Sequence, residues 1–183
     1  MFYEVEVAGI KRQLQLYRVS DSLSIAAFIL FGDVEITKAA AKELLKKAPE
    51  FDVIMTAEAK SIPLIYEMAY QAGKNDYVIA RKGVKVYMTD PIDVEVESIT
   101  TQHKQTLYLG QEDAAKMKDK KVLIIDDVIS TGESLKAMEK IVEKAGGNIV
   151  AKMAIFAEGD AMGRDDIIVL EELPVFDENG NKK

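Results

Sequence analysis

The chain has 183 residues, of which 48% are hydrophobic and 30% are charged, and its formal net charge is −7. A domain takes roughly 100–200 residues, so this length and composition predict one domain with its own hydrophobic core and exclude a disordered chain. The negative charge argues against a nucleic-acid-binding surface, which needs clustered Lys and Arg, and the absence of cysteine excludes disulfides and thiolate metal sites.

The N-terminal segment shows neither an export signal nor a membrane span. Glu4 and Glu6 stand where a secretory signal needs a basic start and an apolar run. The longest uncharged apolar stretch, residues 22–31, is about half of the ~20 residues that a spanning helix requires. We therefore expect a soluble, cytoplasmic protein with no membrane partner.

The first half of the chain alternates between helical and strand patterns. Apolar residues recur at helical spacing over residues 34–48 and stop at Pro49, which predicts an amphipathic helix. A short β-rich run follows at residues 51–56, and a second helix is predicted over residues 62–72. Residues 77–80 predict another strand.

The second half begins with a predicted hairpin and continues with further strands and a helix. Alternation over residues 92–96 and the run at 106–109 predict the two arms of a long hairpin. Residues 122–125 form an apolar run typical of a strand buried on both faces, and a helix is predicted over residues 135–145. A strand is expected at residues 149–156.

Two shorter segments complete the prediction. Residues 167–170 suit an edge strand, and the tail at 177–183 is expected to fray. The β-α-β-α-β order favours an α/β fold with an open, mostly parallel twisted sheet and helices on both faces, because each crossover must pack back on the sheet in the right-handed sense.

The residues best suited to bind a ligand lie at 122–135. Asp126 and Asp127 follow the buried strand there, and a Ser/Thr/Gly loop then begins a helix. Ligands of open α/β sheets bind at the carboxyl ends of the strands, and a helix N-terminus offers free N–H groups to a phosphate. The loop therefore predicts a monophosphate site. The adjacent carboxylates suit a vicinal diol and, through water or sugar oxygens, Mg²⁺.

A structural alternative is that the two acids merely end the strand and cap the helix. The segment is not a dinucleotide fingerprint, since the G-x-G-x-x-G glycines are missing, and not a P-loop, since no Gly-Lys-Ser/Thr follows.

Two acids followed by Ser-Thr-Gly-Glu-Ser resemble the phosphoribosyl pyrophosphate (PRPP) motif of the type I phosphoribosyltransferase family. The segment Thr-Ala-Glu-Ala-Lys-Ser-Ile-Pro-Leu at residues 56–64 is similar to the pyrophosphate loop of that family, which often carries a non-proline cis peptide. Residues 78–85 resemble the next strand and its basic exit in the adenine and xanthine enzymes. The three motifs occur in family order.

The resemblance implies a purine phosphoribosyltransferase that displaces pyrophosphate from PRPP by a nitrogen of a base, with Asp126 and Asp127 as catalytic residues and indirect ligands of Mg²⁺. The residues expected at the 5′-phosphate are Ile129, Ser130, Thr131, Gly132, Glu133 and Ser134. Those expected at the pyrophosphate are Glu58, Ala59, Lys60, Ser61, Arg81, Lys82 and Lys85.

A mobile loop that closes over the site is expected between the hairpin arms, and it makes His103 and Lys104 weak catalytic candidates. A lone histidine in a polar loop is more often a solvated side chain. The resemblance also places a small base-binding hood at residues 1–33, followed by the enzyme core at residues 34–183.

Two departures from the family bear on the base. Ser130 stands where the 6-oxopurine enzymes carry an Asp, and Thr101 or Gln102 stands where the adenine enzymes often carry a Glu. Adenine is the first choice and xanthine or another base the alternative. Candidate base contacts in the hood are Leu16, Tyr17, Arg18 and Phe28, although residues such as Leu16 and Phe28 more often belong to the core.

Two other functions are open from the sequence. One is a non-catalytic module that senses PRPP or a nucleotide, and the other is a relative that has lost ligand binding. Related enzymes are commonly dimers, so the resemblance also implies a homodimer.

Overall fold

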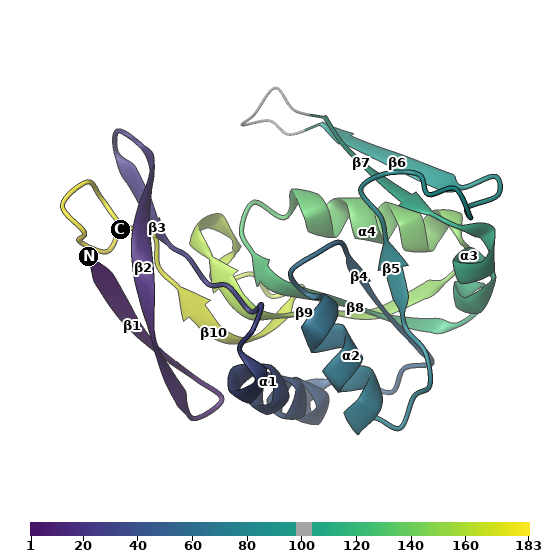
Figure 1. Ribbon diagram of the computed structural model, residues 1–183, viewed down its shortest axis with the longest axis horizontal. Helices are drawn as coiled ribbons and strands as arrows, with labels where there is room; N and C mark the ends of the chain where they lie inside the picture. The colour runs from purple at the N-terminus through teal and green to yellow at the C-terminus, as the bar shows by residue number, and fades with distance from the viewer. Residues whose placement is uncertain (98–103) are drawn as a thin grey trace.

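The computed structural model describes residues 1–97 and 104–183, and for residues 96, 97, 104 and 105 it describes the backbone alone. At its centre lies one five-stranded sheet in the order β10-β9-β8-β4-β5, with every neighbouring pair parallel (Figure 1). Its strands are β4 (Val53–Ala57), β5 (Val78–Ala80), β8 (Lys121–Ile129), β9 (Asn148–Glu158) and β10 (Ile168–Leu173). The predicted parallel α/β sheet is confirmed.

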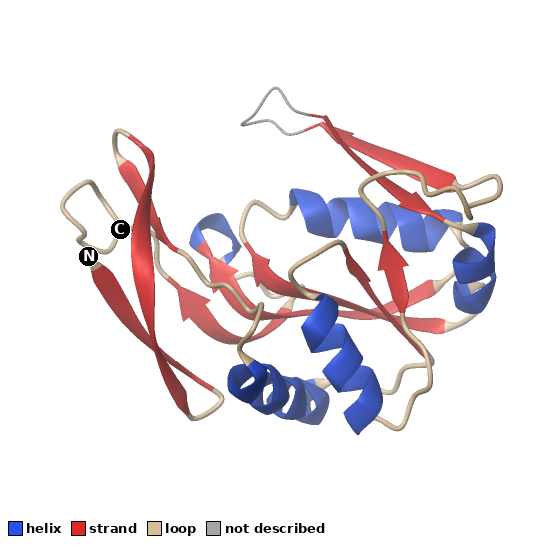
Figure 2. Ribbon diagram, viewed as in Figure 1, coloured by secondary structure: helices blue, strands red, loops and turns tan. Residues whose placement is uncertain are grey.

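Helices cover both faces of this sheet (Figure 2). They are α1 (Val34–Lys47) and α2 (Ile62–Gln71) on one face, and α4 (Glu133–Lys144) on the other, with α3 (Gln111–Met117) and a 3-10 turn η1 (Gly159–Ala161) in connections. Successive residues of β8 pack into different cores: Ile124 belongs to the cluster around α4, and Leu123 and Ile125 belong to the cluster around α1 and α2. This alternation explains why residues 122–125 of β8 are all apolar.

The predicted hairpin is present as β6 (Ile92–Glu97) paired antiparallel with β7 (Lys104–Leu109). A backbone bridge between Arg81 and Tyr108, with N–H···O distances of 2.8 Å in both directions, ties β7 to the exit of β5. Leu107 and Leu109 are fully buried in the core beneath α4. The hairpin is therefore anchored to the residues that follow β5.

Three antiparallel strands form the hood beside β10: β1 (Phe2–Val7), β2 (Ile10–Ser20) and β3 (Leu23–Ala26) (Figure 1). The C-terminal tail packs on it, because Ser24 and Phe176 exchange backbone hydrogen bonds of 2.8 and 2.9 Å. Lys183 Nζ also donates to Ser22 O at 2.6 Å. The prediction that the tail frays is wrong, since these contacts hold it against the hood.

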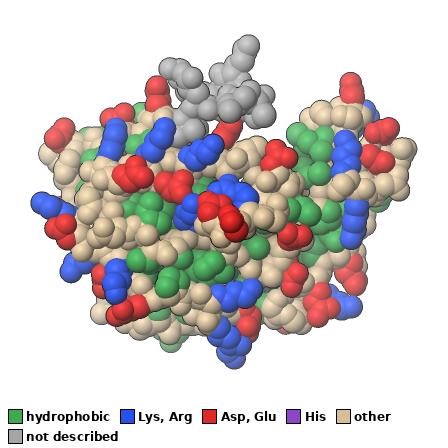
Figure 3. Space-filling view, turned by 180° about the vertical axis from the view of Figure 1, so that it is seen from behind, with side chains coloured by type: hydrophobic (Ala, Val, Ile, Leu, Met, Phe, Trp, Pro, Cys, Tyr) green, Lys and Arg blue, Asp and Glu red, His purple; other side chains and the backbone are tan. Residues whose placement is uncertain are grey.

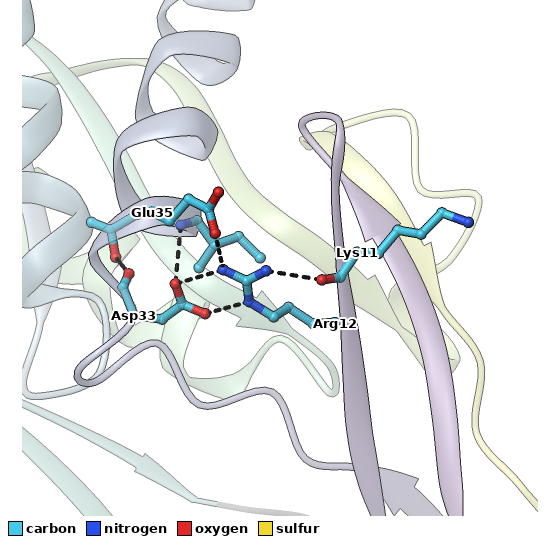
Figure 4. Close-up of polar contacts among 6 residues, drawn as sticks. Lys11, Arg12, Asp33 and Glu35 are labelled. Atoms are coloured by element: carbon cyan, nitrogen blue, oxygen red, sulfur yellow. Dashed lines mark hydrogen bonds and ion pairs between the residues drawn. The ribbon is translucent and has the colours of Figure 1, made fainter.

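A single arginine joins the hood to the start of α1 (Figure 4). Arg12 on β2 donates to both carboxylate oxygens of Asp33 at 2.6 and 3.0 Å, and to Glu35 Oε2 at 2.7 Å. Asp33 Oδ1 also accepts the Ile36 N–H at 3.1 Å and so caps α1. The orientation of the hood is thus coupled to the N-terminus of a core helix.

Charged side chains of both signs are interspersed over the face seen from behind in Figure 3, without a broad basic area among the coloured residues. Among the described residues, none of the helices combines the length and the apolar character needed to span a bilayer.

Candidate active site

The two acids lie within β8, whose backbone pairing with β9 continues past them. Asp126 pairs with Ala154, and the register runs on to Ile129 opposite Ala157. The sequence predicted that the strand ends at residue 125, but the parallel ladder extends it to Ile129. The acids are therefore held by a strand and not by a loop.

Ser61, the residue that precedes α2, joins the two carboxylates. Its hydroxyl lies 2.7 Å from Asp126 Oδ1 and 3.2 Å from Asp127 Oδ1, and it accepts the Asp127 N–H at 2.9 Å. A hydroxyl has one proton to donate, so the shorter contact to Asp126 is the one we assign as its hydrogen bond. Ser61 is 1% exposed, and the pair is thus fixed from the side of the predicted pyrophosphate loop.

Burial and mutual repulsion shape the electrostatics of the pair. Burial, followed by the negative charge of Asp127, raises the pKa of Asp126 to about 7, and the hydrogen bond from Ser61 opposes this shift. Lys60 Nζ lies 2.9 Å from Asp127 Oδ2. That contact has the distance of an ion pair but not the geometry of a hydrogen bond, because the same oxygen is buried without a hydrogen-bond partner. The charge of Asp127 is therefore balanced by Lys60, while its buried Oδ2 has no hydrogen bond.

The loop from Ser130 to Ser134 forms a small open pocket directly after β8. Its lining residues are Asp126, Val128, Ile129, Ser130, Thr131, Gly132, Glu133, Ser134 and Leu135. Gly132 caps α4 in the left-handed region with φ 79°, which a residue with a side chain rarely adopts. The predicted combination of hydroxyls, a flexible glycine and a helix N-terminus is thus assembled next to Asp126.

The predicted pyrophosphate loop lies between β4 and α2 and contains the expected cis peptide, at Glu58-Ala59. Glu58 links this loop to the exit of β5: it accepts the Lys82 N–H at 2.9 Å and pairs with Arg81 Nη2 at 3.0 Å. The Lys82 hydrogen bond and then the Arg81 contact lower the pKa of Glu58. The three predicted motifs therefore meet at the carboxyl ends of β4, β5 and β8.

Comparison with known proteins identifies this arrangement. A family model described as a phosphoribosyl transferase domain matches residues 33–176. This chain belongs to the phosphoribosyltransferase family.

Curated relatives and solved structures agree with that family. The chain is 33% identical over 146 residues to the adenine phosphoribosyltransferase of Thermosipho africanus, which covers 79% of this chain and 82% of the relative. A match to the Thermotoga maritima enzyme of the same name is 36% identical over 102 residues and spans 56% of either protein. The predicted enzyme class, a transferase of pentosyl groups, is confirmed.

The fold agreement extends over nearly the whole chain. The structure of adenine phosphoribosyltransferase from Thermoanaerobacter pseudethanolicus aligns with a TM-score of 0.68 over 94% of this chain and 95% of that one, at 24% identity. The Saccharomyces cerevisiae enzyme, solved with D-2,5-dideoxy-2,5-imino-altritol 1,6-bisphosphate and adenine, aligns with a TM-score of 0.69 over 86% and 93%, at 19% identity.

The acid pair of this phosphoribosyltransferase suits one mode of metal binding. Within the described residues no group of three or more His, Cys, Asp or Glu side chains forms an all-protein metal site. Mg²⁺ instead commonly binds through one or two carboxylates together with substrate phosphates and water. Asp126 and Asp127, with one carboxylate oxygen free of hydrogen bonds, fit this second mode.

The basic residues expected at the pyrophosphate differ in their surroundings. Arg81 is already paired with Glu58 and donates to the Tyr87 hydroxyl at 2.5 Å. Lys85 is half-buried, and its charge contributes to the lowered pKa of Glu58. Lys60 and Lys82 are exposed amines at the ends of the two loops. The charge of Arg81 is thus largely balanced by Glu58, and Lys60 is paired with Asp127, whereas Lys82 presents its exposed amine to a ligand.

The four residues predicted as base contacts in the hood also differ in their burial and in their contacts. Phe28 is 5% exposed and packs edge-on against Phe156 at 4.9 Å, which supports its alternative assignment to the core. Leu16 is half-buried against the same core. Arg18 hydrogen-bonds to Ser20 O and Asp21 within its own turn. Tyr17 is 49% exposed and is the hood candidate most open to a ligand.

The two weak catalytic candidates are the least described of the predicted residues, and some residues near the site were not predicted from the sequence. His103 lies outside the described residues, and Lys104 is described only as the first backbone position of β7. Conversely, Ile29 and Phe31, just before α1, are exposed hydrophobic residues that were not predicted as candidate base contacts. Arg164, which contacts Gly132, was also missed, because no local motif connects positions so far apart.

Proposed function

We propose that this chain is an adenine phosphoribosyltransferase, which converts adenine and PRPP to AMP and pyrophosphate. The observation that carries the proposal is the acid pair of β8 lying between the phosphate pocket and the loop before α2. Adenine is proposed as the base because the relatives that match over most of this chain carry that activity in their names.

PRPP binding follows from the three loops. The 5′-phosphate binds at Ser130 to Ser134, where the amides of the first turn of α4 and three hydroxyls donate hydrogen bonds. The ribose hydroxyls donate to the carboxylates of the acid pair, of which Asp126 lines the phosphate pocket and Asp127 is paired with Lys60. The pyrophosphate lies against the segment from Glu58 to Ser61, with Lys60 and Lys82 beside it.

In the reaction a nitrogen of adenine forms a bond to the anomeric carbon as the bond from that carbon to pyrophosphate oxygen breaks, and the nitrogen loses its proton. The sugar becomes more positive in the transition state, and the fixed carboxylates of Asp126 and Asp127 stabilise that charge. Mg²⁺, when bound with PRPP, neutralises pyrophosphate charge, and Asp126 and Asp127 are the residues that would hold it through water or ribose oxygens.

The test is a screen of adenine, xanthine, hypoxanthine, guanine, uracil and orotate with PRPP, with and without Mg²⁺, read as nucleotide formed. A preference for adenine supports the proposal. A preference for xanthine or another base would keep the enzyme class and change the substrate. PRPP binding in calorimetry without turnover on any base would favour a sensing module.

A homodimer is part of the same proposal. Val84, Val86 and Tyr87, in the segment after β5, are 55%, 107% and 67% exposed, and such apolar side chains suit a protein surface that meets a second copy. Sedimentation equilibrium should give twice the chain mass, and Val86→Lys should shift the equilibrium toward the monomer. A wild-type protein that stays monomeric at all concentrations would contradict this part of the proposal.

A further inference from the structure

Arg164 lies in the connection between η1 and β10 and reaches back to the phosphate pocket. Figure 1 shows η1, in yellow-green, beside the loop that leads from β8 into α4. A Cβ atom added to Gly132 would lie only 2.7 Å from Arg164 Nη1, so this nitrogen lies close to the position that a side chain would take. The positive φ of Gly132 disfavours a side chain, and Arg164 borders the space that glycine leaves open.

The guanidinium is fixed from its opposite edge. Arg164 Nε donates to Asp166 Oδ1 at 2.8 Å and Nη2 donates to Oδ2 at 2.7 Å, a bidentate pair that sets the plane of the group. Nη1, which takes no part in this pair, is the nitrogen turned toward Gly132. The hydrogen bonds to Asp166 raise the pKa of Arg164, so the side chain keeps its charge at every working pH.

The fixation continues into the sheet and into α4. Lys152 on β9 also pairs with Asp166, and its Nζ lies 2.8 Å from Glu139 Oε1 on α4. Lys152 is 17% exposed and Glu139 24%, so this network is partly shielded from solvent. Two residues of each sign take part, and the net charge near the pocket is thus small. The effect of Arg164 on the pocket is consequently one of geometry more than of added charge.

We propose that Arg164 is a positioning residue that holds the Gly132 turn in the conformation that binds the 5′-phosphate of PRPP. This inference rests on the proposed function, because it assumes that the 5′-phosphate binds at Ser130 to Ser134. The planar fork is essential: a lysine keeps the charge but cannot make the bidentate pair with Asp166 and direct a further nitrogen toward Gly132 at once.

The experiment compares Arg164→Gln and Arg164→Lys with the wild type in steady-state kinetics and in calorimetric titrations with ribose 5-phosphate. We expect KM for PRPP and Kd for ribose 5-phosphate to rise roughly tenfold in both variants, because the turn is no longer held in the conformation that binds the phosphate. KM for adenine should change less than twofold. Lys46→Gln, which removes one exposed positive charge of an α1 surface pair, is the matched control and should leave all three constants unchanged.

Circular dichroism and thermal melting establish that each variant is folded, and Asp166→Asn gives an independent route to the same turn. That variant should raise KM for PRPP in the same direction while leaving Arg164 itself in place. Unchanged ribose 5-phosphate affinity in folded Arg164 variants overturns the inference, and so does full recovery by lysine. Failure of the proposed function is a separate result, because it appears as absence of adenine turnover in the wild type.

Discussion

The carboxyl edge of the parallel sheet and the hood are built on different physical principles. At the edge, buried groups contact one another closely: Ser61 is 1% exposed and Asp127 3%, and one hydroxyl serves both acids. The hood is an antiparallel sheet whose link to α1 rests on partly exposed charges, with Arg12 and Asp33 side chains 29% and 26% exposed. The edge is thus suited to stabilise charge, whereas the hood is held to the core through an ion pair that is partly open to solvent.

The largest effect should come from the edge, in Asp127→Asn. This change removes the charge that we propose stabilises the sugar while keeping the size of the side chain. We expect kcat/KM to fall by about 10²–10³-fold, the cost of losing one oriented charge contact in a transition state. The measurement is steady-state turnover of adenine and PRPP.

Asp113→Asn, at an exposed pair with Lys116, is the matched control for charge and should retain full activity. If folded Asp127→Asn keeps its turnover within about twofold, the edge does not carry the chemistry.

The next effect tests whether the acids act as a pair, through Ser61→Ala. Removal of the hydroxyl leaves the buried Asp127 N–H with Asp126 Oδ1 as its remaining acceptor and deprives Asp126 of the hydrogen bond from Ser61. We expect a loss of about 1–3 kcal/mol in the free energy of unfolding, measured with urea, together with reduced turnover. An unaltered free energy of unfolding and unaltered turnover would show that Ser61 does not hold the acid pair in place.

A smaller and more selective effect is expected at the hood, in Arg12→Gln. Loss of the contacts to Asp33 and Glu35 releases β2 from α1. KM for adenine should rise several-fold while KM for PRPP stays the same, because the hood is proposed to cover the base. Lys11→Gln, on the same strand but 64% exposed, is the control. An equal rise in both KM values would mean that the hood and the edge are not separable.

The smallest effect concerns pH and the cap of α1. The hydrogen bond from Arg12 lowers the pKa of Asp33 below its ordinary 3.8. A lowered pKa in the folded state gives stability that is present above the ordinary pKa and is lost as the pH falls through the lowered one. Asp33→Ala should therefore cost about 1 kcal/mol near neutral pH, as for loss of an N-cap, and less below pH ~4. A cost that does not vary with pH would argue against the ionic part of this contact.

The contrast between the central sheet and the hood also explains which elements could be predicted from the sequence. The helix from Val34 and the strand and helix around residues 121–144 were predicted because each has a long apolar pattern and recognisable ends. Helix α3 was missed because its seven residues are too few to show a period. The strands of the hood were not predicted because their alternation is weak, with most of β2 exposed.

For the site, the sequence could predict residues that are adjacent in the chain but not side chains that meet from distant positions. Asp126, Asp127 and the phosphate loop are contiguous, so the sequence shows them together. Arg12 with Asp33, and Arg164 with Gly132, meet only through the tertiary fold, and no spacing rule reveals such pairs. Phe28 illustrates the converse: an aromatic residue in the right segment is used by the core.

The extension of β8 beyond its acids has a consequence for how the enzyme moves. Because β8 pairs with β9 as far as Ile129, the amide protons beneath the acids can exchange with solvent only when the central sheet opens. Their exchange should be among the slowest in the protein and almost insensitive to saturating PRPP. If PRPP slows the exchange of any amide proton in this region, the effect should begin at Ser130. That residue would then mark the boundary between the rigid strand β8 and the phosphate loop that responds to the ligand.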